Sequence, residues 1–247
     1  FLSGGGALDQ KIGEFLNSIG LPTLQGYGLT ETSPVVSCNI PGKIKIDTVG
    51  SPFKTNEVKI AEDGEILVSG ENVMNGYWND PDATSKTLIN GWVHTGDIGE
   101  FDDEDYLKIT DRKKDILVNA GGDNISPTRV EAKLDIEPEI AQSMLYGDYK
   151  NYLVAVIVPD KDFAINWAKE NSKDQVFESI VKDEDFIKTM KEIVNKVNKN
   201  LSVIEQVRKF ILIDQEFTIE NSMMTVSMKV RRFAVKDKYR DQLEKLY

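Results

Sequence analysis

The first thirty residues constrain the fold most, because they set a strand, a helix and a second strand in a fixed order. Phe1-Leu2 ends an apolar strand, and Gly4–Gly6 forms a turn after it. Gly20 stands where a helix ends, Pro22 prevents its continuation, and a short strand then leads into Tyr27. This order predicts a βαβ unit at the edge of a largely parallel sheet. The helix itself is indicated by apolar residues at helical spacing, namely Leu8, Ile12, Phe15 and Ile19.

Short strands and tight turns replace this pattern in residues 43–110. Apolar and polar residues alternate on both sides of Asp63-Gly64, which predicts a hairpin with a two-residue turn. A second hairpin is predicted over residues 98–109, turning through the acidic run 102–105. The two hairpins predict a small distorted antiparallel β-barrel.

A third pattern begins near residue 112 and is typical of an α+β domain. We therefore expect two domains, at residues 1–111 and 112–247. The predicted fold class is α/β and α+β: the C-terminal end of a larger domain, with a βαβ sheet edge and a small antiparallel barrel, followed by a small α+β domain. The elements predicted in the second domain are helices at 127–134 and 236–247, a helix with its apolar face at Phe186, Met190, Ile193, Val194 and Val197, and strands at 140–146, 153–158 and 210–213.

Composition excludes several classes of protein. The 247 residues hold 30 Lys and Arg against 41 Asp and Glu, a formal charge of −11, which argues against nucleic-acid binding. No apolar run approaches the ~18 residues of a membrane span. Cys38 is the only cysteine, so a reducing compartment such as the cytoplasm fits. Because the sequence opens on Phe1 inside a strand, we expect a fragment of a longer protein.

The stretch GYGLTET, from Gly26 to Thr32, combines features of a phosphate-binding loop. Its glycines allow a tight turn and a close approach to a ligand. Thr30 offers a hydroxyl to a phosphate oxygen, and Glu31 offers a carboxylate to Mg²⁺. A glycine-rich loop with solvated polar tips explains the same residues equally well, so both interpretations stay open here.

The stretch WVHTGDIGEF, from Trp92 to Phe101, places Asp97 after a Thr-Gly pair between apolar runs. A carboxylate in such a position can accept both hydroxyls of a ribose, although a Thr-Gly-Asp triplet also occurs by chance. His94 is the only histidine. We expect it to be a half-buried strand residue rather than a general base, because no nucleophile stands near it in sequence.

Two further stretches carry basic residues. In residues 109–131, the run Arg112–Lys114 precedes a turn at Gly121-Gly122 and a helix start at Ser126-Pro127. An interdomain linker with solvated charges explains this stretch on its residues alone. Lys229 lies in a polar stretch near the C-terminus, and by itself it indicates only a surface charge.

These four stretches, together with GEILVSGENVMNGYWNDPDAT at residues 64–84, occur in an order that resembles the adenylate-forming superfamily. That superfamily comprises acyl-CoA synthetases, luciferases and peptide-synthetase adenylation domains, and the resemblance covers essentially the whole chain. Within it the chain is most similar to the long-chain fatty acyl-CoA ligases. The similarity rests on DRKKDILVNAGGDNISP and on residues 224–229, which take the place of a Leu-Thr-Pro-Thr-x-Lys run.

The resemblance implies a nucleotide site in residues 1–111, the C-terminal part of a large AMP-binding domain. The loop that contains Gly5, Gly6 and Ala7 would pack on the adenine. Tyr27, followed by Gly28, would stack on the base or flank it.

The charged part of the site is implied in the same way. Thr30 would bind the adenylate phosphate, and Glu31 would help to hold Mg²⁺. Asp97 would bind the ribose hydroxyls, assisted by Arg112. Lys229 would enter the site during adenylation, so the catalytic residues implied are Thr30, Glu31 and Lys229.

The resemblance also assigns residues 112–247 as a mobile C-terminal domain. Lys114 matches the hinge, and Gly121 and Gly122 would line the passage for the arm of CoA. Two departures from the family pattern stand out. The glycine-, serine- and threonine-rich phosphate loop of the family is absent and would lie N-terminal to Phe1, so the resemblance implies that the N-terminal half is missing, and we expect the fragment alone to be inactive. In addition, Val226 replaces a common proline before the lysine.

The function implied is that of a fatty acyl-CoA ligase. A fatty acid, ATP and CoA would be the substrates, with Mg²⁺ as the activating ion. An alternative within the class is a fatty acyl-AMP ligase that loads a carrier protein, and an alternative outside it is a non-catalytic nucleotide-binding module of the same fold. Peripheral contact with a membrane is left open, because long-chain substrates partition into membranes.

Overall fold

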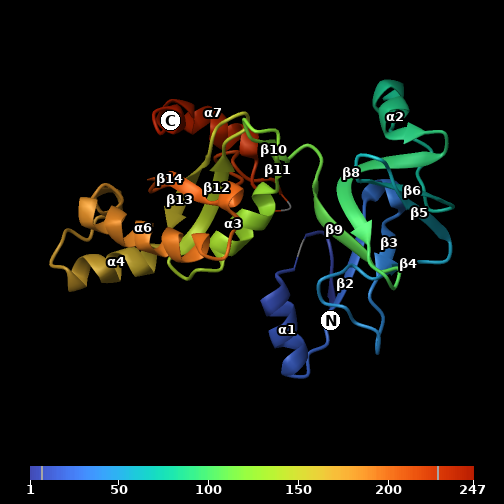
Figure 1. The fold of residues 1–247 in the computed structure, drawn as a ribbon, viewed down its shortest axis with the longest axis horizontal. Helices are drawn as coiled ribbons and strands as arrows, with labels where there is room; N and C mark the ends of the chain where they lie inside the picture. The colour runs from blue at the N-terminus through green and yellow to red at the C-terminus, as the bar shows by residue number, and fades with distance from the viewer. Residues whose placement is uncertain (7, 227) are drawn as a thin grey trace. The chain divides into compact units, whose positions relative to one another are not determined.

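The structure is a computed structural model that describes residues 1–6, 8–226 and 228–247. Its contacts divide the chain into unit 1, Phe1–Lys114, and unit 2, Asp115–Tyr247 (Figure 1). In the part of the chain that is described, no helix is both long enough and apolar enough to cross a membrane.

Unit 1 begins with the predicted strand–helix–strand unit. β1 and β2 are parallel and pair Leu2 with Leu24. Asp9 caps the connecting helix by accepting a hydrogen bond from the Ile12 amide, and Gly20 follows the helix with φ of 79°. The pairs β2–β3 and β3–β4 are antiparallel, so β1–β2 is the one parallel pair among the described strands of this sheet. The elements are β1 (Leu2–Ser3), α1 (Gln10–Ser18), β2 (Leu24–Gly28), β3 (Val35–Cys38) and β4 (Ser51–Pro52).

The apolar side of α1 is exposed in unit 1. Ile12, Phe15 and Ile19 are 47%, 60% and 53% exposed. The helix packs instead through Gly13, where an added Cβ would lie 2.6 Å from Cγ2 of Ile46. The apolar spacing therefore predicted the helix correctly, but the contact with the rest of unit 1 is made by its glycine.

A second, antiparallel sheet in unit 1 has the strand order β5-β6-β8-β7, with β9 paired to β8. Its edge joins the first sheet, because the amide of Val49 donates to the Leu107 carbonyl and the amide of Leu107 donates to the Gly50 carbonyl. The resulting half-barrel encloses a small core of Tyr27, Val36, Ile66, Val68 and Leu107. The elements are β5 (Asn56–Ile60), β6 (Glu65–Gly70), α2 (Pro81–Thr87), β7 (Leu88–Ile89), β8 (Trp92–Phe101) and β9 (Leu107–Arg112).

Both predicted hairpins are present, but the turn of the first is longer than expected. β5 and β6 pair Ile60 with Ile66, and the Ala61 amide donates to the Glu65 carbonyl. The two-residue turn at Asp63-Gly64 is therefore wrong. Three residues form the loop, and Gly64 takes φ of 83° as in a turn that ends in a bulge.

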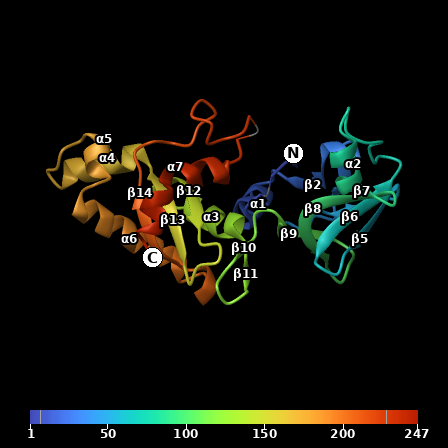
Figure 2. The same cartoon turned by 90° about the horizontal axis from the view of Figure 1, so that it is seen from above.

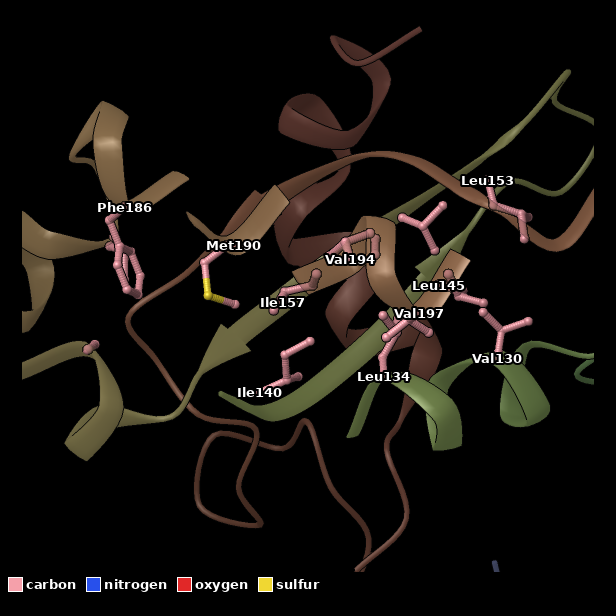
Figure 3. Close-up of a cluster of buried hydrophobic side chains, with 14 of the residues drawn as sticks. Val130, Leu134, Ile140, Leu145, Leu153, Ile157, Phe186, Met190, Val194 and Val197 are labelled. Atoms are coloured by element: carbon pink, nitrogen blue, oxygen red, sulfur yellow. The ribbon is translucent and has the colours of Figure 1, made fainter. Parts of the chain in front are cut away.

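Unit 2 is built on a three-stranded sheet with the order β12-β13-β14. β13 is antiparallel to β12 and parallel to β14, and α4 to α6 make the crossover between the parallel strands. Successive residues of β13 enter two separate cores, because side chains alternate across a strand. Figure 3 shows the first core, where Ile157 meets side chains of α3 and α6. The second core packs the other face of the sheet against α7.

The predicted strands and helices of unit 2 are all present, with one correction. The terminal helix was expected at the surface over residues 236–247. It begins at Arg232 instead, and Val235, Tyr239 and Leu243 form a buried side. Its charged residues conceal this apolar spacing. The elements are β10 (Leu117–Val118), β11 (Asn124–Ile125), α3 (Pro127–Asp135), β12 (Ile140–Tyr146), β13 (Leu153–Pro159), α4 (Lys161–Glu170), α5 (Phe177–Ile180), α6 (Glu184–Asn198), β14 (Val207–Leu212) and α7 (Arg232–Glu244), with short 3-10 helices η1 (Thr30–Thr32) in unit 1 and η2 (Val203–Glu205) in unit 2.

Candidate functional site

Three of the predicted site residues form one hydrogen-bonded group in unit 1. Tyr27 Oη donates to Asp97 Oδ2 at 2.8 Å, although the two residues are 70 positions apart. Arg112 Nε donates to the other carboxylate oxygen, Oδ1, also at 2.8 Å. β2, β8 and β9 carry the three residues, and the pairing of β8 with β9 sets Asp97 opposite Arg112. The sequence motifs thus meet at one place in the half-barrel.

Burial distinguishes the members of this group. Asp97 is 4% exposed and Tyr27 is 8% exposed, whereas the side chain of Arg112 is 52% exposed. Burial, followed by the charge of Asp97, raises the pKa of Tyr27 well above its usual range, so the phenol remains protonated and donates. Only Arg112 of the three presents most of its side chain to solvent. The stacking of Tyr27 on a base stays a prediction.

The backbone around Asp97 is fixed by Thr95. The Thr95 hydroxyl donates to the Ile66 carbonyl at 2.7 Å and accepts from the Asp97 amide at 3.1 Å. Gly96 lies between them with φ of 71°, a conformation that favours glycine. Each residue of the Thr-Gly-Asp triplet therefore has a structural role in this strand. Together they bend the middle of β8 at the point where the Asp97 carboxylate turns inward.

The phosphate-loop candidate forms η1 directly after β2. Thr32 is fully buried, and its hydroxyl accepts from the Leu29 amide at 3.0 Å. Gly28 is obligatory, because a Cβ there would lie 1.6 Å from the Pro34 carbonyl oxygen. Thr30 is exposed and Glu31 is half-buried. The turn therefore presents the hydroxyl and the carboxylate that the sequence singled out, on a backbone held by residues on either side.

The first glycine loop lies beside the same strand. A Cβ added to Gly4 would lie 3.6 Å from the carbonyl oxygen of Gly26, the residue before Tyr27. Gly5 has φ of 82°, and both Gly5 and Gly6 are exposed. The structure thus places this loop next to Tyr27. Ala7, predicted as part of the loop, lies outside the described residues.

A buried carboxylate that sequence reasoning missed supports the same bend of β8. Glu65 is 5% exposed, and it accepts hydrogen bonds from the Gly96 amide at 2.9 Å and from Lys113 Nζ at 3.0 Å. Its Oε2 also lies 3.1 Å from Nδ1 of His94. Burial raises the pKa of Glu65, but the bonds from Lys113, His94 and Gly96 outweigh burial and hold the pKa below its usual value.

Lys113 has a structural task that its place in a basic run did not reveal. Its ammonium bonds Asp63 Oδ2 at 2.5 Å as well as Glu65, and its amide donates to the Gly96 carbonyl at 2.8 Å. The single histidine, His94, is a half-buried strand residue as predicted. Lys114, the predicted hinge, is exposed and is the last residue of unit 1.

In unit 2, the predicted CoA passage is the tight turn between β10 and β11. Oδ1 of Asn119 accepts from the amides of Gly121 and Asp123 at 2.8 and 2.9 Å. Gly122 has φ of 87°, and a Cβ there would meet nothing within 4 Å. The turn is thus rigid and open to solvent, which is compatible with close approach of a slender ligand.

Lys229 lies in the loop that precedes α7. Met224 and Val230 pair as an isolated bridge, the Thr225 amide donates to the Lys229 carbonyl, and the Lys229 amide donates to the Thr225 hydroxyl. These bonds hold the backbone of Lys229 beside that of Thr225, and Lys229 is exposed. Seen from above in Figure 2, the described part of the segment between β14 and α7 and the β10–β11 hairpin extend on opposite sides of unit 2.

The described residues contain no group of three or more His, Cys, Asp or Glu side chains that could hold a metal ion by themselves. Mg²⁺ does not require one, since proteins commonly bind it through one or two carboxylates together with phosphates and water. Glu31 has one oxygen, Oε1, bonded to Tyr77 Oη at 2.7 Å. A single half-buried carboxylate of this kind fits a Mg²⁺ ion that arrives with a nucleotide.

Comparison with protein families gives two matches. Residues 1–78 match the family described as AMP-binding enzyme, and residues 114–247 match the family described as AMP-binding enzyme C-terminal domain. The long-chain-fatty-acid–CoA ligase FadD15 of Mycobacterium bovis is 38% identical over 248 residues, which cover 100% of this chain and 41% of that protein. Human long-chain-fatty-acid–CoA ligase 1 is 32% identical over 245 residues, covering 93% of this chain and 35% of that protein. The chain thus spans about two fifths of the length of these relatives or less.

Solved structures show the same architecture. The adenylation domain of a carboxylate reductase from Mycobacterium chelonae superposes with a TM-score of 0.81 at 24% identity, over 100% of this chain and 38% of that one. The o-succinylbenzoate CoA synthetase of Bacillus subtilis, in complex with its acyl-adenylate intermediate, gives a TM-score of 0.74 at 27% identity over 96% of this chain and 45% of that one. These likenesses confirm the predicted fold class.

Proposed function

Since this chain belongs to the AMP-binding enzyme family, we propose that it is part of a fatty acyl-CoA ligase. The full-length protein would join a fatty acid to AMP, with release of pyrophosphate from ATP, and then transfer the acyl group to the thiol of CoA. The substrate class is supported by relatives named as long-chain-fatty-acid–CoA ligases.

One observation carries the proposal: the buried carboxylate of Asp97 is held between Tyr27 and Arg112, beside the turn that presents Thr30 and Glu31. A carboxylate fixed at both oxygens is pre-organised to accept the hydroxyls of a ribose. Phosphates on the same nucleotide would then reach the Thr30–Glu31 turn, because Tyr27 is only three residues before Thr30. A solvated surface loop would have no use for this arrangement.

The chemistry needs positioning and charge neutralisation more than it needs a protein nucleophile. The fatty acid carboxylate attacks the α-phosphorus of ATP and pyrophosphate leaves, so no bond to the enzyme forms. Thr30 would bind a phosphate oxygen, and Glu31 would hold Mg²⁺, which neutralises phosphate charge when bound. Preorganised charges of this type contribute several kcal/mol, roughly 3–4 for one donor, to the transition state.

We assign unit 2 two separate tasks. Lys229 would neutralise charge on the phosphate during adenylation, and the turn at Gly121-Gly122 would admit the CoA thiol afterwards. The support is that the two elements extend on different sides of one unit (Figure 2), so that one small domain can present them in turn. Lys114, at the end of unit 1, is the residue we propose as the hinge.

The test uses the full-length protein with a series of fatty acids. ATP–pyrophosphate exchange that depends on added fatty acid, followed by formation of acyl-CoA when CoA is supplied, is the expected result. Acyl-adenylate formation with transfer only to the phosphopantetheine of a carrier protein would favour the acyl-AMP ligase. Absence of fatty-acid-dependent exchange, with nucleotide binding retained, would favour a non-catalytic module and contradict the proposal.

A further inference from the structure

We propose that Tyr77 is a positioning residue, which orients the carboxylate of Glu31 for the metal–nucleotide complex. The inference rests on the proposed function, because it concerns the carboxylate to which that function gives a metal. Tyr77 Oη donates to Glu31 Oε1 at 2.7 Å across 46 residues of sequence. Tyr77 would not touch the reacting atoms; it would act through Glu31.

The contact belongs to a strap that residues 72–77 form over the turn at residues 30–35. The Asn72 amide group donates to the Thr32 carbonyl at 2.7 Å. The Met74 amide donates to the Glu31 carbonyl at 2.9 Å. The strap therefore holds both the backbone and the side chain of Glu31, and the carboxylate is fixed relative to the turn that carries it.

The backbone of Tyr77 is itself fixed by the start of α2. The Thr84 hydroxyl accepts from the Tyr77 amide at 2.9 Å and donates to the Asp80 carbonyl at 2.7 Å. Gly76 has φ of 144°, and a Cβ there would lie 2.8 Å from Cγ2 of Thr84. The phenol thus projects from a backbone whose position is set by a helix turn, which is the support a positioning residue requires.

The hydrogen bond from Tyr77 leaves one oxygen of the Glu31 carboxylate for a ligand. One oxygen of Glu31 is used by Tyr77, and no bond to Oε2 is found among the described residues. The Tyr77 hydroxyl is the donor in this bond, because an ionised carboxylate can only accept. Partners of this type orient metal ligands, and their loss commonly costs about 10–100-fold in metal affinity or activity.

The experiment compares metal binding by variants of the full-length protein. Tyr77→Phe should weaken Mn²⁺ binding about ten-fold, measured by electron paramagnetic resonance with a non-hydrolysable ATP analogue. The Mg²⁺ concentration for half-maximal acyl-adenylate formation should rise by a similar factor. Tyr106→Phe, the same change in the turn between β8 and β9, should alter neither. Thr84→Val, which removes only the anchor of the Tyr77 backbone, should give a smaller shift in the same direction.

A double-mutant cycle separates action through Glu31 from general damage. Glu31→Gln alone should weaken Mn²⁺ binding more than Tyr77→Phe does, and adding Tyr77→Phe to Glu31→Gln should cause no further loss. Additive effects of the two substitutions, or unchanged Mn²⁺ affinity in Tyr77→Phe, would overturn the inference about Tyr77. The proposed function would still stand if the wild-type protein showed fatty-acid-dependent exchange. A wild-type protein without such exchange would refute the function itself.

Discussion

Arg112 of β9 lies opposite Asp97 of β8, and its Nε donates a 2.8 Å hydrogen bond to Oδ1 of that carboxylate. Two residues later unit 1 ends, at Lys114. Arg112, which holds the carboxylate proposed to bind the ribose, is thus close in sequence to the proposed hinge. A change of backbone conformation at Lys114 would therefore follow directly after a strand that is fixed in the site.

We predict that Asp97→Ala in the full-length protein weakens ATP binding more than fatty acid binding. Losing hydrogen bonds to a charged acceptor costs about 1.5–3 kcal/mol, roughly ten- to hundred-fold in affinity. Calorimetric titration of ATP and the two Michaelis constants would measure the effect. Asp103→Ala, a change at an exposed carboxylate in the acidic turn, is the control. An unchanged affinity for ATP would remove Asp97 from the ribose site.

The two half-reactions should separate when unit 2 is altered. Lys229→Ala should suppress acyl-adenylate formation by two orders of magnitude or more, about 3 kcal/mol, and largely spare thioester formation from supplied acyl-adenylate and CoA. Gly122→Leu should do the reverse, because its side chain would obstruct the thiol. Single-turnover assays of each step would measure both effects.

The positive φ at Gly122 calls for a control of its own. Gly122→Ala imposes the backbone strain without the bulk, so it should impair thioester formation much less than Gly122→Leu does. Equal loss of both half-reactions in Lys229→Ala and Gly122→Leu would contradict the assignment of separate tasks to unit 2.

Glu65 should make the protein sensitive to acid. Its pKa is below the ordinary 4.5, so its contribution to stability is complete above about pH 4.5 and is lost as the pH falls through its value in the folded protein. Glu65→Gln should lower the midpoint of thermal unfolding at pH 7, because the bonds from Lys113 and His94 lose their charge assistance. The same variant should lose less stability than wild type between pH 5 and pH 3. Exposed Glu62→Gln should follow the wild-type profile, and a parallel profile for Glu65→Gln would show that the carboxylate is not the titrating group.

The buried ion pair between Glu131 of α3 and Arg232 of α7 should be essential to unit 2. The side chain of Glu131 is 10% exposed and that of Arg232 is 22% exposed. Burial raises the pKa of Glu131, and the hydrogen bond and charge of Arg232 partly offset this rise. Removing one partner of such a pair costs about 3–5 kcal/mol, since the other is left buried and charged.

Chemical denaturation of Arg232→Ala and of exposed Arg240→Ala would measure that cost. Only the first variant should shift the midpoint by the full amount. The double variant Glu131→Gln/Arg232→Met should recover part of the loss. If Arg232→Ala were as stable as wild type, the pair would contribute nothing to the fold.

Most helices and strands could be predicted from short sequence patterns, because caps, turns and apolar spacing act within a few residues. The glycine at position 20, the serine cap before Pro127 and the continuous apolar run of β13 each follow from one segment of sequence. α2, α4 and α5 were missed. α2 and α5 are short, but α4 carries Phe163, Ala164, Trp167 and Ala168 at helical spacing, a local signal that was present and was overlooked. The apolar side of α1 was found, but its exposure was not, because exposure depends on which elements lie nearby.

The site divides in the same way. Motif order singled out Tyr27, Asp97 and Arg112, yet their direct contact arises only when β2, β8 and β9 come together. Glu65 looked like an ordinary strand residue after a turn, and nothing in its neighbours indicated that it would lie buried beneath Gly96. Tyr77 could have been suspected only from its place in a family motif, since its partner lies 46 residues away.

Both faces of the β12–β13–β14 sheet are covered by helices from residues 115–247. Both hydrophobic cores of unit 2 are therefore formed by one continuous segment of the chain. A recombination breakpoint after Lys114 would divide neither of its two cores. Unit 2 is therefore a self-contained segment that should be exchangeable between related AMP-binding enzymes. Hybrids joined at this point should fold at high frequency, whereas those joined inside β13 should fail.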